Sequence, residues 1–167
     1  MKALGYSVHE ASMTGMSILI TMIVVFPISA KLSDIFGRRF VLFSGAIAIL
    51  ISTLPAFRIV GDMNFNNAFI AQVGYAAIVA WYMGPVPTVL VELFPTRVRL
   101  TGVALSYNVS AALFGGTAPM MAMLLQRWLD DKFAIAYYIM GLAVFTLVVI
   151  RHYKESYKKS LIDGETM

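Results

Sequence analysis

Five long apolar stretches, separated by short charged segments, constrain the fold of this chain more than any other feature. They cover residues 12–30, 41–58, 68–91, 101–126 and 134–151. A helix needs about 20 apolar residues to cross the hydrocarbon core of a bilayer. Only 13% of the 167 residues are charged and 59% are hydrophobic, whereas a soluble domain is about 25% charged. The sequence therefore predicts an all-α membrane protein with about five transmembrane helices, surrounded by the lipid bilayer.

The basic residues gather in alternate connections between these stretches. Loops 31–40 and 92–100, together with the segment after residue 150, hold nine of the thirteen Lys and Arg residues. The positive-inside rule places these three segments in the cytoplasm, so we expect the N-terminus outside and the C-terminus inside a bacterial plasma (inner) membrane. Residues 1–151 are expected to form a partial transmembrane bundle and residues 152–167 a solvated cytoplasmic tail.

Several classes of function are disfavoured by what the sequence lacks. The absence of cysteine excludes disulfides and thiolate metal sites. No G-x-S-x-G, H-E-x-x-H or P-loop motif is present. We therefore expect no enzymatic activity, no metal and no cofactor. The net charge of +4 does not indicate nucleic acid binding, because the basic residues lie beside apolar segments.

The first basic loop reads AKLSDIFGRR over residues 30–39. Gly37 permits a positive φ in the tight turn that joins two helices. Asp34 can accept hydrogen bonds from helix-start amides or from an arginine, and Arg38 and Arg39 offer forked donors. The loop is either an ordinary cytoplasmic turn or a functional cytoplasmic motif.

The second basic loop reads ELFPTRVR over residues 92–99. Pro95 ends the preceding helix, and Thr101 or Thr96 is expected to cap the next one. Glu92 lies at the membrane edge and is expected to pair with an arginine. Its candidate partners are Arg38, Arg39 and Arg97, and Arg99 completes the basic set. A cluster joining the two loops would act as a cytoplasmic gate; the alternative is a static surface salt bridge, worth about 0–1 kcal/mol.

Glycine and proline interrupt the third and fourth apolar stretches. Pro85 and Pro87 leave the carbonyls of Trp81 and Met83 without their helical donors. In the fourth stretch, Gly115, Gly116 and Pro119 predict a kink or partial unwinding. Freed carbonyls inside a membrane are tolerated only against protein or a wet cavity. The fourth stretch also carries small residues at helical spacing, which suit close helix packing: Gly102, Ser106 and Ser110.

Polar and aromatic side chains within the apolar stretches are candidates for a substrate path. They are Gln72, Tyr75, Trp81, Tyr82, Tyr107 and Asn108. Aromatic faces can hold a quaternary ammonium group by cation–π attraction, but the same side chains also serve as packing or lipid-facing residues. No Asp, Glu, Lys, Arg or His lies in the middle of a predicted span, so we expect no proton carrier within these helices.

These motifs together resemble the metabolite:proton symporter family of the major facilitator superfamily, which includes proline/betaine, shikimate, citrate and 2-oxoglutarate carriers. The residues that carry the resemblance are ELFPTRVR at 92–99, Thr101-Gly102, Ser106-Tyr107-Asn108 and FGGTAP at 114–119. Loop 30–39 matches the superfamily's cytoplasmic signature in part, because Ala30 and Ile35 replace its usual Gly and Arg. Sugar porters share GPVP and ELFPTRVR but usually carry Asn-Trp at 108–109 and lack GGTAP, so they rank second.

The resemblance implies that the five helices are the eighth to twelfth of a twelve-helix carrier. Such carriers hold substrate between two six-helix halves, near the membrane midplane. We therefore expect a truncated, non-autonomous part of a symporter that moves a small polar metabolite or osmolyte with protons by alternating access. Its partner would be a missing N-terminal half or a full-length relative. The alternative is a non-transporting membrane partner, which the departures at Ala30 and Ile35 favour.

Overall fold

The computed structural model describes residues 7–62, 64–131 and 133–152, and these residues form helices joined by short connections. The helices are α1 (Val8–Phe36), α2 (Arg38–Gly61), α3 (Phe65–Met83), α4 (Val86–Glu92), α5 (Arg99–Ser110), the π-helical segment η2 (Ala111–Gly115), α6 (Ala118–Leu129) and α7 (Ala134–His152). The expected cytoplasmic tail at 152–167 lies outside the described residues from 153 onward.

The prediction of five membrane-length helices is confirmed. Five stretches of the described chain are long and apolar enough to cross a membrane, and each extends beyond its predicted bounds. Two of the five are interrupted: the third consists of α3 and α4, and the fourth of α5, η2 and α6. A capping box at Ser7 and Glu10 begins α1, because each side chain accepts a hydrogen bond from the other's backbone amide.

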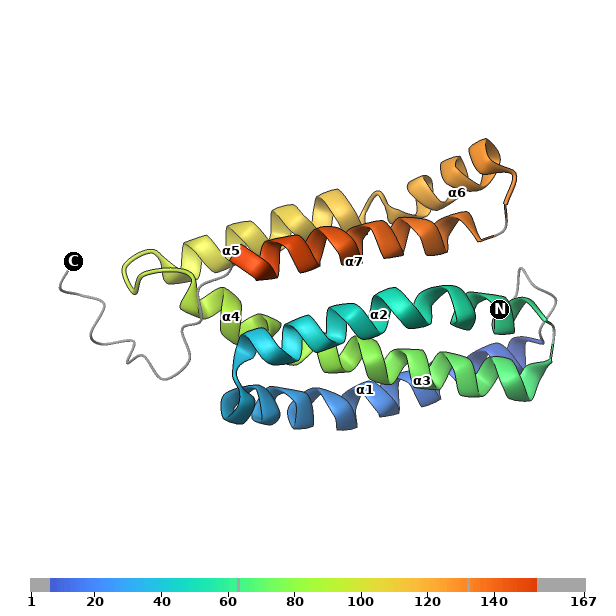
Figure 1. Ribbon diagram of the computed structural model, residues 1–167, viewed down its shortest axis with the longest axis horizontal. Coiled ribbons are helices and arrows are strands. Elements are labelled where there is room, and N and C mark those ends of the chain that lie inside the picture. The colour runs from blue at the N-terminus through green and yellow to red at the C-terminus, as the bar shows by residue number, and fades with distance from the viewer. Residues whose placement is uncertain (1–6, 63, 132, 153–167) are drawn as a thin grey trace.

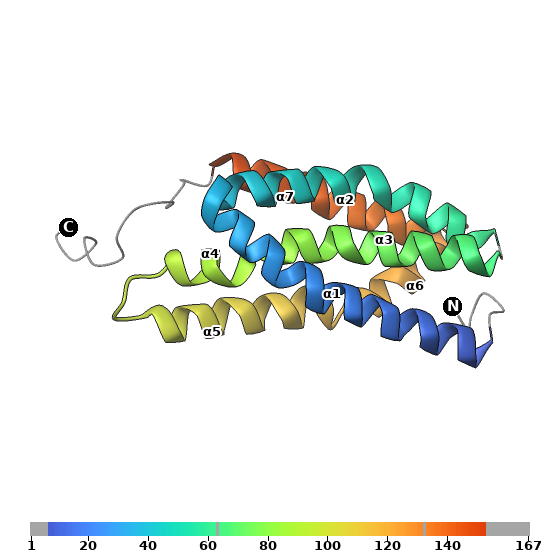
Figure 2. The ribbon, with the colours of Figure 1, turned by 90° about the horizontal axis from the view of Figure 1, so that it is seen from below.

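The helices run along the long axis of the molecule (Figure 1), with α1 crossing α3 obliquely (Figure 2). The α1–α2 turn, the α4–α5 loop and the C-terminal end of α7 lie at one end of the molecule. The α2–α3 and α6–α7 connections lie at the other end. The segments predicted to be basic and cytoplasmic are thus grouped together as far as the structure describes them.

Helices α1, α2 and α3 pack closely because small residues let their backbones approach. A Cβ added to Gly45 of α2 would lie 2.9 Å from the Cβ of Tyr82 on α3. A Cβ added to Gly84, after α3, would lie 2.7 Å from the Cβ of Ser29 on α1. Small residues at such contacts are the usual means of packing helices in membranes, where water supplies no driving force.

The break between α3 and α4 falls at Gly84-Pro85, where the sequence predicts carbonyls without their helical donors. Pro85 cannot donate to the carbonyl of Trp81. In the structure this carbonyl accepts a hydrogen bond from the hydroxyl of Ser29 on α1, which is completely buried. A neighbouring helix thus supplies the donor that the helix itself lacks.

The predicted distortion of the fourth span is present as a π-helical turn followed by a break. The amide of Gly116 donates to the carbonyl of Ala111, five residues back, at 3.0 Å. The hydroxyl of Thr117 donates to the carbonyl of Leu113, and α6 then begins with Pro119 in its first turn. π-Helical turns are rare and occur often at functional sites.

The predicted cap of the fourth span is wrong. The N-cap is Val98, without a side-chain hydrogen bond, rather than Thr101 or Thr96. The amide of Val98 donates to the carbonyl of Pro95, and the carbonyl of Val98 accepts from Gly102. After the turn that follows Pro95, α5 thus begins at Arg99, two residues before Thr101, which leaves this threonine inside the helix.

Candidate functional site

An ion pair joins the two basic loops. The guanidinium of Arg38, at the start of α2, lies 2.8 Å from a carboxylate oxygen of Glu92 at the end of α4. The same nitrogen of Arg38 lies 3.1 Å from the carboxylate of Asp34 in the last turn of α1. Gly37 between α1 and α2 has φ 98° and ψ 143°, which glycine adopts readily and other residues do not. The turn at Gly37 therefore presents Arg38 to two carboxylates from different helices.

Burial separates the two carboxylates. The side chains of Arg38 and Glu92 are 13% and 9% exposed, whereas that of Asp34 is 60% exposed. The contact between Arg38 and Glu92 is therefore not an exposed surface bridge, because both side chains are largely shielded from water. Surface pairs contribute little to stability, whereas removing one partner of a buried pair is costly.

The buried pair is only partly satisfied. The Nε atom of Arg38 and the Oε2 atom of Glu92 are buried without a hydrogen-bond partner. A bidentate pair would use both atoms. The desolvation cost of a buried ion pair is offset only when its remaining polar atoms are also bonded. The Arg38–Glu92 contact is therefore less favourable than a pair in which every polar atom is bonded.

The other arginines of the two loops have separate roles. Arg39 donates to the carbonyl of Arg151 at the C-terminal end of α7, at 3.2 Å, where a positive charge complements the helix dipole. Arg99 donates to the carbonyl of Phe94 within its own loop, at 3.2 Å. Arg97 is exposed. Of the three predicted partners of Glu92, the structure brings Arg38 to it, and the start of α2 joins α1, α4 and α7.

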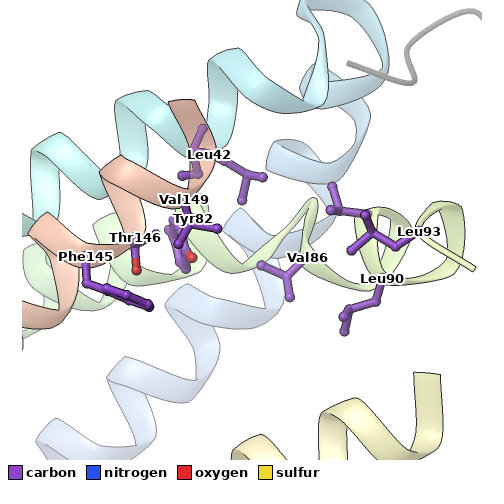
Figure 3. Close-up of a pocket in the computed structure, with 10 residues that line it drawn as sticks. Leu42, Tyr82, Val86, Leu90, Leu93, Phe145, Thr146 and Val149 are labelled. Carbon is purple, nitrogen blue, oxygen red and sulfur yellow. The ribbon is translucent and has the colours of Figure 1, made fainter. Parts of the chain in front are cut away.

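A groove of about 280 Å³ lies between α4 and α7, with residues of α2 and α3 also in its lining (Figure 3). Its lining is largely aliphatic or aromatic: Leu42, Tyr82, Val86, Val89, Leu90, Leu93, Phe145, Thr146, Val149 and Ile150. Its polar side-chain groups are the hydroxyls of Tyr82 and Thr146. The groove therefore offers a small polar metabolite little to bind.

The aromatic candidates of α3 contribute mainly to helix packing. The hydroxyl of Tyr75 lies 3.0 Å from that of Thr53 on α2, and the indole nitrogen of Trp81 donates to Ser44 on α2 at 3.1 Å. Tyr82 lines the apolar groove. Gln72, also on α3, is half-buried.

The two candidates on α5 lie apart from this aromatic group. Asn108 is exposed and donates to the carbonyl of Ala104 in its own helix, at 2.7 Å. Tyr107 is 63% exposed. The structure therefore does not bring the six candidates into one cluster. They form a half-buried set on α3 and an exposed pair on α5, next to the π-helical turn.

Sequence reasoning missed the hydroxyl groups that hold the bundle together. Ser29 is completely buried, and so is Thr53; both bond to residues of α3. The signal that could have identified them is a serine or threonine inside an apolar stretch, where a polar group needs a partner.

Membrane-length helices, two of them broken by glycine or proline and several joined at one end by arginine contacts, define a polytopic α-helical membrane protein. The family model of the Major Facilitator Superfamily matches residues 1–165. The chain belongs to this superfamily, as the sequence motifs predicted.

The relatives are named as transporters. The chain is 31% identical to the proline/betaine transporter of Salmonella typhimurium over 158 residues, which is 95% of this chain and 31% of the transporter. It is 32% identical to the ectoine/proline transporter of Corynebacterium glutamicum, over 92% of this chain and 31% of that protein. It is 29% identical to a citrate-proton symporter of Klebsiella pneumoniae, over 79% of this chain and 31% of that protein.

The chain thus spans about a third of the length of these relatives. No solved structure matches it.

Proposed function

We propose that this chain forms part of a proton-coupled secondary transporter for a small polar osmolyte or metabolite of the proline/betaine or organic-acid type. The observation that carries this proposal is the buried pair of Arg38 and Glu92, which joins the ends of α2 and α4 in a chain of this superfamily. A partly satisfied ion pair between helix ends is suited to closing the cytoplasmic side and to opening during transport. We call this pair the latch.

The exposed part of the fourth span is the proposed contribution of this chain to the substrate path. Residues 107–117 are exposed in the structure, and they include Tyr107, Asn108 and the π-helical turn. Backbone that departs from α-helix inside a membrane is tolerated against other protein or a water-filled cavity. The remaining wall of the path and the proton-carrying group would come from helices beyond the five described.

A chimera tests this proposal directly. The segment of the Salmonella typhimurium proline/betaine transporter that matches this chain is replaced by residues 1–167, and uptake of labelled proline is measured in cells without other proline carriers. We expect uptake by the chimera and none by the 167-residue chain alone. Strong uptake by the chain alone would show that it is autonomous. No uptake by a correctly inserted chimera would count against the proposed substrate class.

The latch is tested within the same chimera. Glu92→Gln removes one charge of the pair and is expected to reduce uptake at least tenfold, about 1.4 kcal/mol. Arg97→Gln is the matched control, because Arg97 is exposed and lies outside the pair; its uptake is expected to stay within about twofold of the parent, about 0.4 kcal/mol. Equal uptake by all three proteins would remove the latch from the mechanism.

A further inference from the structure

Ser29 of α1 occupies an unusual position, directly against the break between α3 and α4. Its side chain is completely buried, and its hydroxyl donates to the carbonyl of Trp81. Proline at position 85 leaves that carbonyl without its helical donor. The backbone at the break is therefore fixed by a side chain of another helix rather than by the helix itself.

The contact leaves no space for adjustment. A Cβ on Gly84 would lie 2.7 Å from both the Cβ and the hydroxyl oxygen of Ser29, and 2.9 Å from the amide nitrogen of Ala30. Such distances are far below ordinary van der Waals contact, so glycine is needed for α1 to approach the break. The hydroxyl can then reach the carbonyl directly.

The two sides of the break are held differently. Before it, α3 is tied to α2 by the bonds from Trp81 to Ser44 and from Tyr75 to Thr53. After it, α4 has only seven residues and ends at Glu92; none of them is fully buried, and Val86 and Val89 pack partly against the cluster of Leu42, Ala46 and Ile150. The helices α1, α2 and α3 are thus joined to one another by hydrogen bonds, and we treat them as the fixed frame. The short helix α4 continues from α3 through a hinge at Gly84-Pro85 and is held by partly buried apolar contacts and by the ion pair at Glu92.

We propose that Ser29 is a positioning residue that acts as the pivot of this hinge and holds α4 at the angle that brings Glu92 to Arg38. The inference deepens the proposed latch and rests on it for its role in transport. With the Ser29 hydroxyl in place, the break has one bonded geometry. Without it, the Trp81 carbonyl lacks a donor, and several angles of α4 become similar in energy.

The absence of cysteine from this chain permits a direct test by spin labelling of the full chain in lipid nanodiscs. One pair of labels, Ile70→Cys on α3 and Val91→Cys on α4, reports the hinge by double electron–electron resonance. A control pair, Ile51→Cys on α2 and Ile70→Cys, reports the fixed frame. All three positions have exposed side chains. We expect Ser29→Ala to broaden and shift the hinge distances and to leave the frame distances unchanged.

A second background distinguishes a pivot from a general packing residue. Pro85→Ala returns an amide hydrogen to position 85, so that the Trp81 carbonyl regains a donor in its own helix. In this background Ser29→Ala is expected to leave the hinge distances unchanged. The proposal would be overturned if Ser29→Ala broadened the hinge distances equally in both backgrounds, or changed the frame distances to the same extent. It would also be overturned if Ser29→Ala left the hinge distances unchanged in the parent chain.

These measurements are independent of transport. The pivot is supported if the hinge distances respond as expected, even when Glu92→Gln has no effect on uptake by the chimera, in which case only the latch fails. If Glu92→Gln abolishes uptake while the hinge distances ignore Ser29→Ala, the latch stands and the pivot fails.

Discussion

At the scale of single residues, Arg38 of the latch contacts two carboxylates, the largely buried one of Glu92 and the exposed one of Asp34. Glu92→Gln leaves the largely buried Arg38 with a neutral partner, while Asp34 still supplies a compensating charge. We expect a loss of about 1–3 kcal/mol, the cost of a buried polar group that loses its partner. The measurement is thermal unfolding of the purified chain in detergent, followed by circular dichroism.

Asp34→Asn is the matched control, because it neutralises a carboxylate on the same arginine that is 60% exposed. Its expected cost is below about 1 kcal/mol, as for other surface pairs. Equal destabilisation by the two substitutions would mean that burial does not distinguish the two carboxylates.

Gly37 is the second residue on which the latch depends, because its backbone conformation sets the direction of the chain between α1 and α2 and so the position of Arg38. Its φ of 98° with ψ 143° lies in a region that residues with a Cβ rarely adopt. Gly37→Ala is expected to cost about 1–3 kcal/mol in unfolding free energy. The control is Gly15→Ala in α1, where no atom lies within 4 Å of the new Cβ; it is expected to stabilise by about 0.5–1 kcal/mol.

At the scale of elements, the close contact of α2 with α3 depends on Gly45. A methyl group there would lie 2.9 Å from the Cβ and 3.0 Å from the Cα of Tyr82. Because a Cα cannot move without its helix, Gly45→Ala is expected to destabilise the bundle by about 1–3 kcal/mol, as overpacking does. Gly74→Ala on α3 is the control, since its Cβ meets nothing within 4 Å. A comparable melting temperature for both variants would contradict this contact.

Elements differ in how far the sequence predicts them. The breaks at Gly84-Pro85 and at Gly115-Gly116 were predictable because proline and glycine act on the backbone locally. The donor that satisfies the Trp81 carbonyl was not predictable, because it comes from Ser29, 52 positions away. The N-cap at Val98 was missed because the turn after Pro95, rather than a threonine side chain, starts α5.

The candidate site follows the same division. That Glu92 needs an arginine follows from its place at the membrane edge, but the choice of Arg38 depends on the turn at Gly37 and on how α4 lies against α2. The substrate-path candidates could not be sorted from sequence. A tyrosine in an apolar stretch has a similar sequence environment whether it bonds to a neighbouring helix, as Tyr75 does, or is exposed, as Tyr107 is.

At the scale of the whole molecule, packing is uneven. Within an 18-residue apolar stretch of the α2 span, 28% of the residues are buried, whereas the corresponding stretch of the span Arg99–Leu129 has no buried residue. Of the predicted packing stripe, Gly102 lies against the ring of Phe94, and Ser106 bonds to the carbonyl of Gly102 in its own helix. In a membrane such an exposed face meets lipid or further helices. Sequence alone does not separate these cases, because both favour apolar and small residues.

The distribution of charge predicts how the whole bundle is oriented in the membrane. The α1–α2 turn and the α4–α5 loop lie at the end that carries the latch, and the α2–α3 connection lies at the opposite end. Single cysteines at Thr96 and Asn66, both exposed, sample these two ends. Because the basic loops are expected in the cytoplasm, an impermeant maleimide should label Asn66→Cys in intact spheroplasts and Thr96→Cys only after permeabilisation.

The reverse pattern would invert the bundle and place the latch on the outer face, where it could not close a cytoplasmic gate. Equal labelling of both cysteines in intact spheroplasts would mean that the chain inserts in two orientations. The positive charges of loops 31–40 and 92–100 would then be too weak a signal to orient these helices without additional segments. Labelling Thr96→Cys again within the chimera separates these possibilities, because the added helices would restore a single orientation only in the second case.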